Sequence, residues 1–162
     1  WTRLEERYGI RIRGVRARLP AVDPGLPPPW ERDPDACCAA RKVRPLQSAL
    51  AELGAWVTGI RREQTPDRAS APVLEWDARF GLFKVNPLAA WTSEDVAAYV
   101  RRFDVPTNPL HARGYPSIGC APCTTPVRPG EDARSGRWRG HEKKECGLHV
   151  ERAPAARESR RP

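Results

Sequence analysis

The chain has 162 residues, of which 40% are hydrophobic and 30% are charged, a composition typical of one ordered globular domain. No apolar run approaches the roughly 20 residues that cross a bilayer, and no charged-then-apolar leader is visible, so we expect no membrane partner and a cytoplasmic location. The formal net charge of +8 is compatible with binding nucleic acid, binding a small anion, or a solvated surface without function.

The first elements are short. Residues 3–8 are predicted to end a helix that Gly9 terminates, and residues 10–12 are predicted to form a short strand. Residues 20–34 are predicted to be a loop, because their prolines disfavour helix. Since the sequence opens as if inside a helix, we expect it to be a piece of a longer chain.

An α/β arrangement is predicted from the next elements. Residues 36–43 and 46–53 are predicted to be helices, with Pro45 in the first turn of the second. The compact apolar run 56–60 is predicted to be a strand. Alternation of strands and helices favours a sheet with parallel pairing.

A hairpin and one well-marked helix follow. Residues 73–77 and 82–86 alternate apolar and polar side chains, which predicts an antiparallel hairpin. Residues 92–95 form a capping box that opens a helix. The apolar side chains of that helix recur at spacings of three and four, so we expect them to lie in the core: Val96, Tyr99, Val100 and Phe103.

Regular structure is expected to thin out after Pro106. We divide the chain into an α/β part at 1–123, a mobile arginine-rich loop with a C-terminal cysteine segment at 124–150, and a disordered tail at 151–162.

Five cysteines fall into three groups: the adjacent Cys37 and Cys38, the C-x-x-C pair Cys120 and Cys123, and the single Cys146. In an intracellular chain this usage favours metal or redox chemistry over disulfides. Four converging thiolates could hold zinc or a [4Fe–4S] cluster. The alternative is that some of these residues are merely small buried apolar side chains.

Cys146 differs from the other four. It follows Lys143 and Lys144, and cationic neighbours favour the thiolate, which is the nucleophilic form of cysteine. The alternative is an exposed cysteine without a role.

Five segments, in order, resemble the motifs of the assimilatory sulfonucleotide reductases, the thioredoxin-dependent adenylyl-sulfate and phosphoadenylyl-sulfate reductases. They are residues 32–46 with the cysteine pair, 56–64 with a strand and arginines, 115–124 with the C-x-x-C pair, 134–138 with an arginine loop, and 144–149 with the sequence Lys-Glu-Cys-Gly-Leu-His.

The resemblance implies a fold. It predicts the C-terminal part of a parallel-sheet, adenine-nucleotide-binding fold of the ATP-pyrophosphatase type, followed by an irregular cysteine-bearing segment. No Ser/Gly-rich phosphate loop is present. We therefore expect the chain to begin near the middle of that fold, to expose apolar strand edges, and to have little activity alone.

The resemblance also implies roles for particular residues. A [4Fe–4S] cluster would be held by Cys37, Cys38, Cys120 and Cys123. The substrate phosphosulfate would be bound by Lys42, Arg134, Arg137 and His149, with Arg61 and Arg62 as weaker candidates. The nucleophile would be Cys146.

The implied reaction is reduction of adenylyl sulfate to sulfite and AMP through a Cys146 S-sulfo intermediate, with thioredoxin or a similar dithiol as reductant. Both cysteine pairs together point to the iron–sulfur branch of the family and to adenylyl sulfate, and 3′-phosphoadenylyl sulfate is the alternative substrate.

Outside this family, the same cysteines and charge are compatible with a zinc-binding nucleic-acid module, or with a non-catalytic remnant that keeps a structural metal. Membership of the reductase family would instead imply no nucleic-acid partner. Oligomeric state stays open, and a homo-oligomer is possible.

Overall fold

The computed structural model describes residues 1–17, 19 and 23–149. Helix α1 (Thr2–Tyr8) ends at Gly9, whose φ of 61° is left-handed, as predicted. The strand predicted at 10–12 is wrong. The backbone N–H of Ile12 instead donates to the Glu5 carboxylate at 2.8 Å, so this segment turns back onto α1 rather than pairing with a strand.

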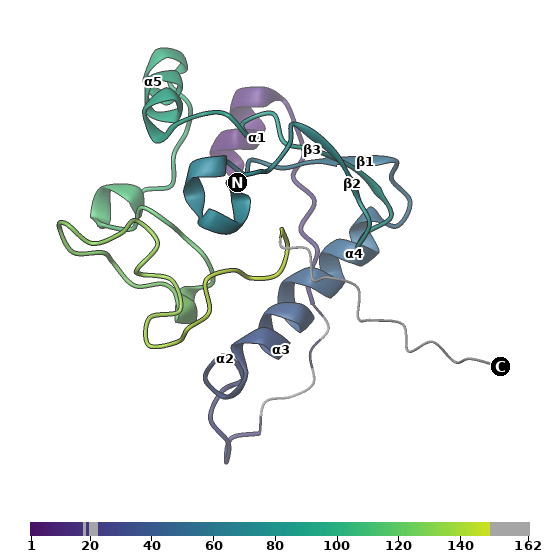
Figure 1. Ribbon diagram of the computed structural model, residues 1–162, viewed down its shortest axis with the longest axis vertical. Helices are drawn as coiled ribbons and strands as arrows, with labels where there is room; N and C mark the ends of the chain where they lie inside the picture. Colours follow the sequence, from purple (N-terminus) through teal and green to yellow (C-terminus); the bar gives the residue numbers. More distant parts are fainter. Residues whose placement is uncertain (18, 20–22, 150–162) are drawn as a thin grey trace.

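A nearly continuous helical rod comes next (Figure 1). It consists of α2 (Pro29–Arg32), α3 (Pro34–Cys38), the π-helical turn η1 (Ala39–Val43) and α4 (Arg44–Leu50). The prediction of helices in this region is confirmed, but α2 lies in the predicted loop because its prolines occupy N-terminal helix positions, where proline is tolerated. The π-helical turn ends just before Pro45, which has no N–H to donate to the preceding turn.

Three strands form one small sheet: β1 (Ala55–Val57), β2 (Leu74–Asp77) and β3 (Leu82–Val85), in the order β1-β3-β2. The predicted hairpin is confirmed, since β2 and β3 are antiparallel. Parallel pairing is confirmed for β1 and β3. The described sheet is therefore mixed rather than purely parallel.

The two faces of this sheet are unusual. The side chains of one face are apolar and largely exposed: Val57, Leu74, Trp76 and Phe83, at 69%, 59%, 54% and 49%. The other face carries the ion pair of Lys84 with Glu75, at 2.8 Å and with Lys84 buried. The sequence predicted exposed apolar strand edges, and the exposed apolar side chains observed lie on a face of the sheet. The charged face is the one turned toward His149 of the site described below.

Helix α5 (Ser93–Phe103) starts as predicted. The Thr92 hydroxyl accepts from the Asp95 N–H at 3.0 Å, and the Asp95 carboxylate accepts from the Thr92 N–H at 2.8 Å. The prediction that its apolar face is core is wrong, because no residue of α5 is buried and Tyr99 and Phe103 are each 46% exposed. The aromatic rings pack against each other instead, with the Tyr99 and Phe103 centroids 4.4 Å apart and the ring planes tilted by 44°.

After α5 the described chain contains only short 3₁₀ turns, η4 (His111–Arg113) and η5 (Ala121–Cys123), and one isolated bridge between Thr124 and Arg137. The predicted loss of regular structure is confirmed. The predicted tail at 151–162 lies outside the described residues. Two further 3₁₀ turns, η2 (Arg62–Gln64) and η3 (Pro66–Arg68), precede the hairpin. None of the described helices has the length and apolar content needed to cross a membrane.

Candidate functional site

A pocket of ≈ 890 Å³ lies where the helical rod, η2 and η3, α5 and the C-terminal residues meet. Its walls contain six of the seven residues that the sequence nominated for catalysis and substrate binding: Lys42, Arg61, Arg134, Arg137, Cys146 and His149. These residues come from positions more than 100 apart in the sequence. The fold thus places one thiol beside five cationic or imidazole side chains.

Arg62 is the nominated residue that does not line this pocket. Its side chain is exposed and its Nε donates to the carbonyl of Ala71 at 2.9 Å. Arg61, its neighbour, lines the pocket and donates to the Glu63 carboxylate at 2.9 Å and to the Ser93 hydroxyl at 3.0 Å.

Arg137 is held in place from two sides. Its Nη1 donates to the carbonyl of Ile118 at 3.2 Å, and its guanidinium lies 4.5 Å from the centroid of the Trp138 ring. A Cβ at Gly119 would lie closer to Nη2 of this guanidinium than van der Waals contact allows, so the arginine would have to move if residue 119 carried a side chain. The buried Nε of Arg137 has no hydrogen-bond partner, so the side chain retains an unused donor.

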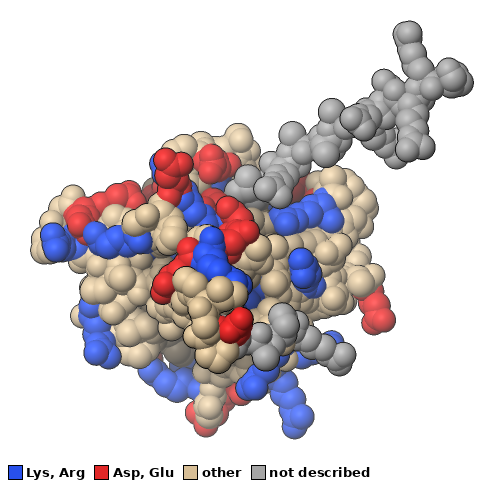
Figure 2. Space-filling model, turned by 90° about the horizontal axis from the view of Figure 1, so that it is seen from below, with Lys and Arg blue, Asp and Glu red and all other residues tan. Residues whose placement is uncertain are grey.

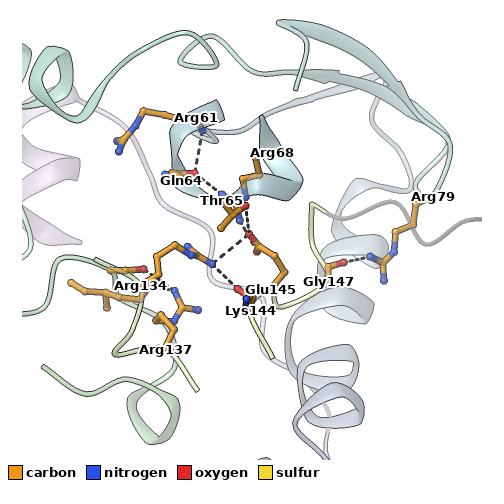
Figure 3. Close-up of polar contacts among 12 residues, drawn as sticks. Arg61, Gln64, Thr65, Arg68, Arg79, Arg134, Arg137, Lys144, Glu145 and Gly147 are labelled. Carbon is orange, nitrogen blue, oxygen red and sulfur yellow. Dashed lines mark hydrogen bonds and ion pairs between the residues drawn. The ribbon is translucent and has the colours of Figure 1, made fainter. Parts of the chain in front are cut away.

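Arg134 reaches across the pocket to the residues before Cys146. Its Nη2 donates to the carbonyl of Lys144 at 2.9 Å and lies 3.4 Å from a carboxylate oxygen of Glu145 (Figure 3). Burial lowers the pKa of Arg134, partly offset by the charge of Glu145, and its side chain is 19% exposed.

The sequence reasoning missed a buried ion pair at the centre of the site. Arg68 Nη2 and a carboxylate oxygen of Glu145 are 2.7 Å apart, with the side chains 9% and 7% exposed (Figure 3). Gln64 accepts from the other Arg68 nitrogen at 2.5 Å. Glu145 belongs to the C-terminal motif at residues 144–149. Arg68 lies in a polar stretch whose sequence is typical of a loop, and no pattern there distinguishes it from its neighbours.

The pKa of Glu145 is lowered in this environment. Burial, the largest single effect, raises it, and the hydrogen bond and charge of Arg68 together with the charge of Arg134 outweigh burial. Glu145 is therefore ionised at neutral pH, and its ion pair forms with both partners charged.

His149 packs flat against Trp56, with ring centroids 5.7 Å apart and an interplanar angle of 7°. Burial, followed by the charges of Arg68 and Lys84, lowers the pKa of His149 to about 4. Among the described residues, no group forms a hydrogen bond with its buried Nδ1. His149 is thus a neutral imidazole in the free protein rather than a cation.

Cys146 is bracketed by contacts to three other parts of the chain. Lys143 pairs with Asp35 at the start of α3, Glu145 pairs with Arg68 in η3, and Arg79 in the β2–β3 turn donates to the carbonyl of Gly147. Cys146 is partly exposed and lines the pocket. It also lines a second hollow, of ≈ 630 Å³, which borders α3. The thiol can therefore be approached from two sides.

The other four cysteines approach one another from α3 and η5. All are free thiols, and Cys38 is buried. Burial raises the pKa of Cys123 most, followed by the charges of Cys120 and Cys37, and Cys120 likewise acts on Cys38. These charge effects place Cys123 near Cys120 and Cys37, and they place Cys38 near Cys146 as well as near Cys120.

Four cysteine thiolates are the donor set that a [4Fe–4S] cluster takes. In the described ranges, no three His, Cys, Asp or Glu side chains are placed to hold a single metal ion. A cubane takes one thiolate at each iron, so its four ligands surround it without meeting at one point. The positive charge of Lys42 acts to lower the pKa of both Cys38 and Cys123, against the effect of burial. Lys42 also lines the pocket.

The basic charge is not gathered into one stripe on the face drawn in Figure 2, where acidic side chains lie among the basic ones. The cationic side chains that share a function are instead those inside the pocket.

A partly exposed thiol at the wall of an arginine-lined pocket is the combination of groups that group transfer from an anionic substrate requires. The phosphoadenosine phosphosulfate reductase domain model matches residues 2–126 of this chain. The chain therefore belongs to the sulfonucleotide reductase family.

Individual relatives agree with this assignment. The chain is 53% identical over 157 residues to an adenosine 5′-phosphosulfate reductase of Burkholderia cepacia, covering 91% of this chain and 63% of that protein. It is 59% identical over 121 residues to the adenosine 5′-phosphosulfate reductase of Mycolicibacterium smegmatis, covering 75% and 51%. It is 58% identical over 122 residues to the phosphoadenosine 5′-phosphosulfate reductase of Gloeobacter violaceus, covering 74% and 51%. The chain thus spans between half and two thirds of the length of these relatives.

A solved structure shares the fold. The phosphoadenylyl-sulfate reductase of Candida auris, crystallised with phosphate, matches with a TM-score of 0.52 and 38% identity, over 60% of this chain and 46% of that one. The family assignment and the mixed α/β fold are therefore supported by sequence and by structure.

Proposed function

We propose that the protein carrying this chain reduces adenylyl sulfate to sulfite and AMP, with Cys146 as nucleophile and a dithiol protein such as thioredoxin as reductant. The observation that carries the proposal is the placement of Cys146 in one pocket with Lys42, Arg134 and Arg137. Relatives named as adenosine 5′-phosphosulfate reductases support the substrate.

The first step forms one bond and breaks one. The Cys146 thiolate attacks the sulfonate sulfur, the bond from that sulfur to the phosphate oxygen breaks, and AMP leaves with the electron pair. Cys146 then carries an S-sulfo group. A thiolate of the dithiol attacks the sulfur of Cys146, sulfite leaves, and the second thiol of the reductant releases Cys146 by forming a disulfide.

The pocket opposes the charge repulsion in the first step. Both the phosphosulfate and the attacking thiolate are negative, so they repel each other in the absence of compensating cations. Arg134 and Arg137 can donate paired hydrogen bonds to the phosphate, where charge accumulates as AMP departs, and Lys42 adds a third positive charge. His149 serves as a neutral hydrogen-bond donor, since its pKa is lowered to about 4.

We also propose that Cys37, Cys38, Cys120 and Cys123 hold a [4Fe–4S] cluster, which places this protein in the iron–sulfur branch. The cluster would fix the segments of α3 and η5 relative to each other and hold Lys42 in the field of the substrate. Iron and acid-labile sulfide analysis of anaerobically purified full-length protein should give about four of each per chain. Zinc without iron would overturn this assignment and favour a zinc-binding module instead.

The substrate itself has a second candidate, 3′-phosphoadenylyl sulfate, because the Gloeobacter violaceus relative and the Candida auris structure are named for it. The full-length protein should be offered both nucleotides together, and sulfite release from each followed with isotopically distinct sulfur. The proposal predicts preference for adenylyl sulfate. A higher kcat/KM for the 3′-phosphorylated nucleotide would replace it.

The reductant is proposed to approach Cys146 from the second hollow, since the first pocket holds the nucleotide. A cytoplasmic location and the division of the chain at residues 123 and 124 stay predictions.

A further inference from the structure

The ion pair of Arg68 and Glu145 stands apart from the others in the molecule. Within residues 1–17, 19 and 23–149, six ion pairs form, and this is the one whose two side chains are both less than a tenth exposed. The residues are 77 positions apart in sequence. A buried charge needs a partner, because an unpaired charge in a low-dielectric interior is costly. The pair therefore constrains where the backbone of residue 145 can lie.

The Glu145 carboxylate is saturated with contacts (Figure 3). One oxygen accepts from Arg68 at 2.7 Å, and the other accepts from the Thr65 hydroxyl at 3.2 Å and faces Arg134 at 3.4 Å. Cys146 is the next residue. Fixing the side chain of Glu145 against η3 therefore fixes the thiol at the pocket wall.

The other two contacts beside Cys146 are weaker anchors. Lys143 pairs with Asp35, whose side chain is 77% exposed, and Arg79, which donates to the Gly147 carbonyl, is exposed. Solvent-exposed pairs contribute little because water and salt screen them. Glu145 thus makes the more buried of the two side-chain ion pairs that Lys143 and Glu145 form with other parts of the chain.

Arg134 links this anchor to substrate binding. The same Nη2 that faces Glu145 belongs to a pocket arginine that the phosphosulfate would engage. Arg68 also lines the pocket. In the free protein the Glu145 carboxylate occupies the position on Arg134 that a substrate anion would take.

We infer that Glu145 is a positioning residue: its buried ion pair with Arg68 holds Cys146 at the pocket wall, and it occupies Arg134 until the substrate anion displaces it. The inference deepens the proposed function and rests on it only in taking Cys146 as the nucleophile. Once Arg134 turns to the substrate, Arg68 keeps Glu145 in place while the thiolate attacks.

The direct test uses the full-length protein without nucleotide. Hydrogen exchange of the peptide spanning 141–149 and alkylation of Cys146 by iodoacetamide are compared between wild type and Glu145→Gln. Both rates should rise about tenfold in the variant, which corresponds to ~1.4 kcal/mol of lost local protection. The matched control is Glu142→Gln, which removes an exposed carboxylate from the same segment and should leave both rates unchanged.

Three outcomes decide the inference. Faster exchange confined to 141–149, with partial recovery in Glu145→Asp and no further increase when Arg68→Gln is added, supports it. Unchanged exchange and alkylation in a folded Glu145→Gln protein overturns it. Equally increased exchange at α5 also overturns it, because Glu145 would then be a general stability residue.

Steady-state kinetics distinguish a positioning role from a purely structural one, because the two roles change kcat and KM differently. Glu145→Gln should lower kcat without raising KM, since Arg134 is freed for the substrate while the thiol loses its position. Arg134→Gln should raise KM instead. The exchange and alkylation measurements need no turnover, so absence of sulfite release from the wild type would refute the proposed function and leave the anchoring role intact.

Discussion

Helix α5 and the segment at residues 141–149 show opposite relations between regularity and burial. Helix α5 has a capping box and an apolar stripe, yet none of its residues is buried. Residues 141–149 have no regular structure, yet they contain Glu145, whose side chain is 7% exposed in its ion pair with Arg68. Local sequence pattern therefore indicates which backbone conformation forms, whereas burial of a side chain in this chain depends on pairings between distant residues.

The largest expected effect concerns the irregular segment. Cys146→Ser in the full-length protein should lower sulfite release at least about 10³-fold, because a hydroxyl is not ionised at neutral pH and is a poor nucleophile. Nucleotide binding, measured by calorimetry with AMP, should persist, since the pocket arginines remain. Turnover within tenfold of wild type would place the nucleophile elsewhere.

A second prediction compares two arginines five residues apart. Arg134 lines the pocket, whereas Arg139 forms an exposed pair with Glu131 at 2.9 Å. Arg134→Gln should lower kcat/KM by about 10²-fold, chiefly through a higher KM, because a charged hydrogen-bond donor to the substrate anion is lost. Arg139→Gln should change kcat/KM less than about twofold, because exposed pairs are screened. Equal losses would show that the pocket is misassigned.

Part of the fold and of the site can be predicted from the sequence, and part cannot. The helical rod, the β2–β3 hairpin and the start of α5 follow from proline positions, alternation and a capping box, which act between near neighbours. Cys146 could be nominated from its cationic neighbours in the sequence, and the other nominated pocket residues only through resemblance to family motifs. Arg68 was missed because its importance comes from Glu145, 77 residues away, and no local pattern encodes that contact. The exposed face of α5 was misjudged because periodicity identifies an apolar stripe and not what covers it.

A third prediction concerns pH. The charged groups around His149 are Arg68, Lys84, Glu145 and Glu75, and its pKa is about 4 in the folded protein. An unfolded histidine binds its proton near 6.5, so between these values the unfolded chain holds more protons and stability falls as pH falls. Going from pH 7.5 to 5 should cost about 2 kcal/mol through this residue.

The check is the thermal midpoint of wild type and His149→Phe between pH 7.5 and 5. Phenylalanine can keep the stack on Trp56 but cannot titrate, so its midpoint should fall less over this range. Parallel curves for the two proteins would mean that the pKa of His149 is the same in the folded and the unfolded chain.

The smallest effect belongs to α5. Phe103→Ala should lower the free energy of unfolding by about 1 kcal/mol, since the side chain is already 46% exposed. Leu82→Ala is the matched comparison in β3, where the residue is 2% exposed, and should cost about 2–5 kcal/mol. Similar costs for both would indicate that the face of α5 is covered in the full-length protein.

The most direct test of the central claim is to trap the covalent intermediate. Full-length protein should be mixed with adenylyl sulfate in the absence of any dithiol, digested, and mapped by mass spectrometry. The account predicts one added SO₃ group on the peptide containing Cys146, released as sulfite when thioredoxin is added. An adduct on another cysteine, or AMP release without any adduct on the protein, would contradict it.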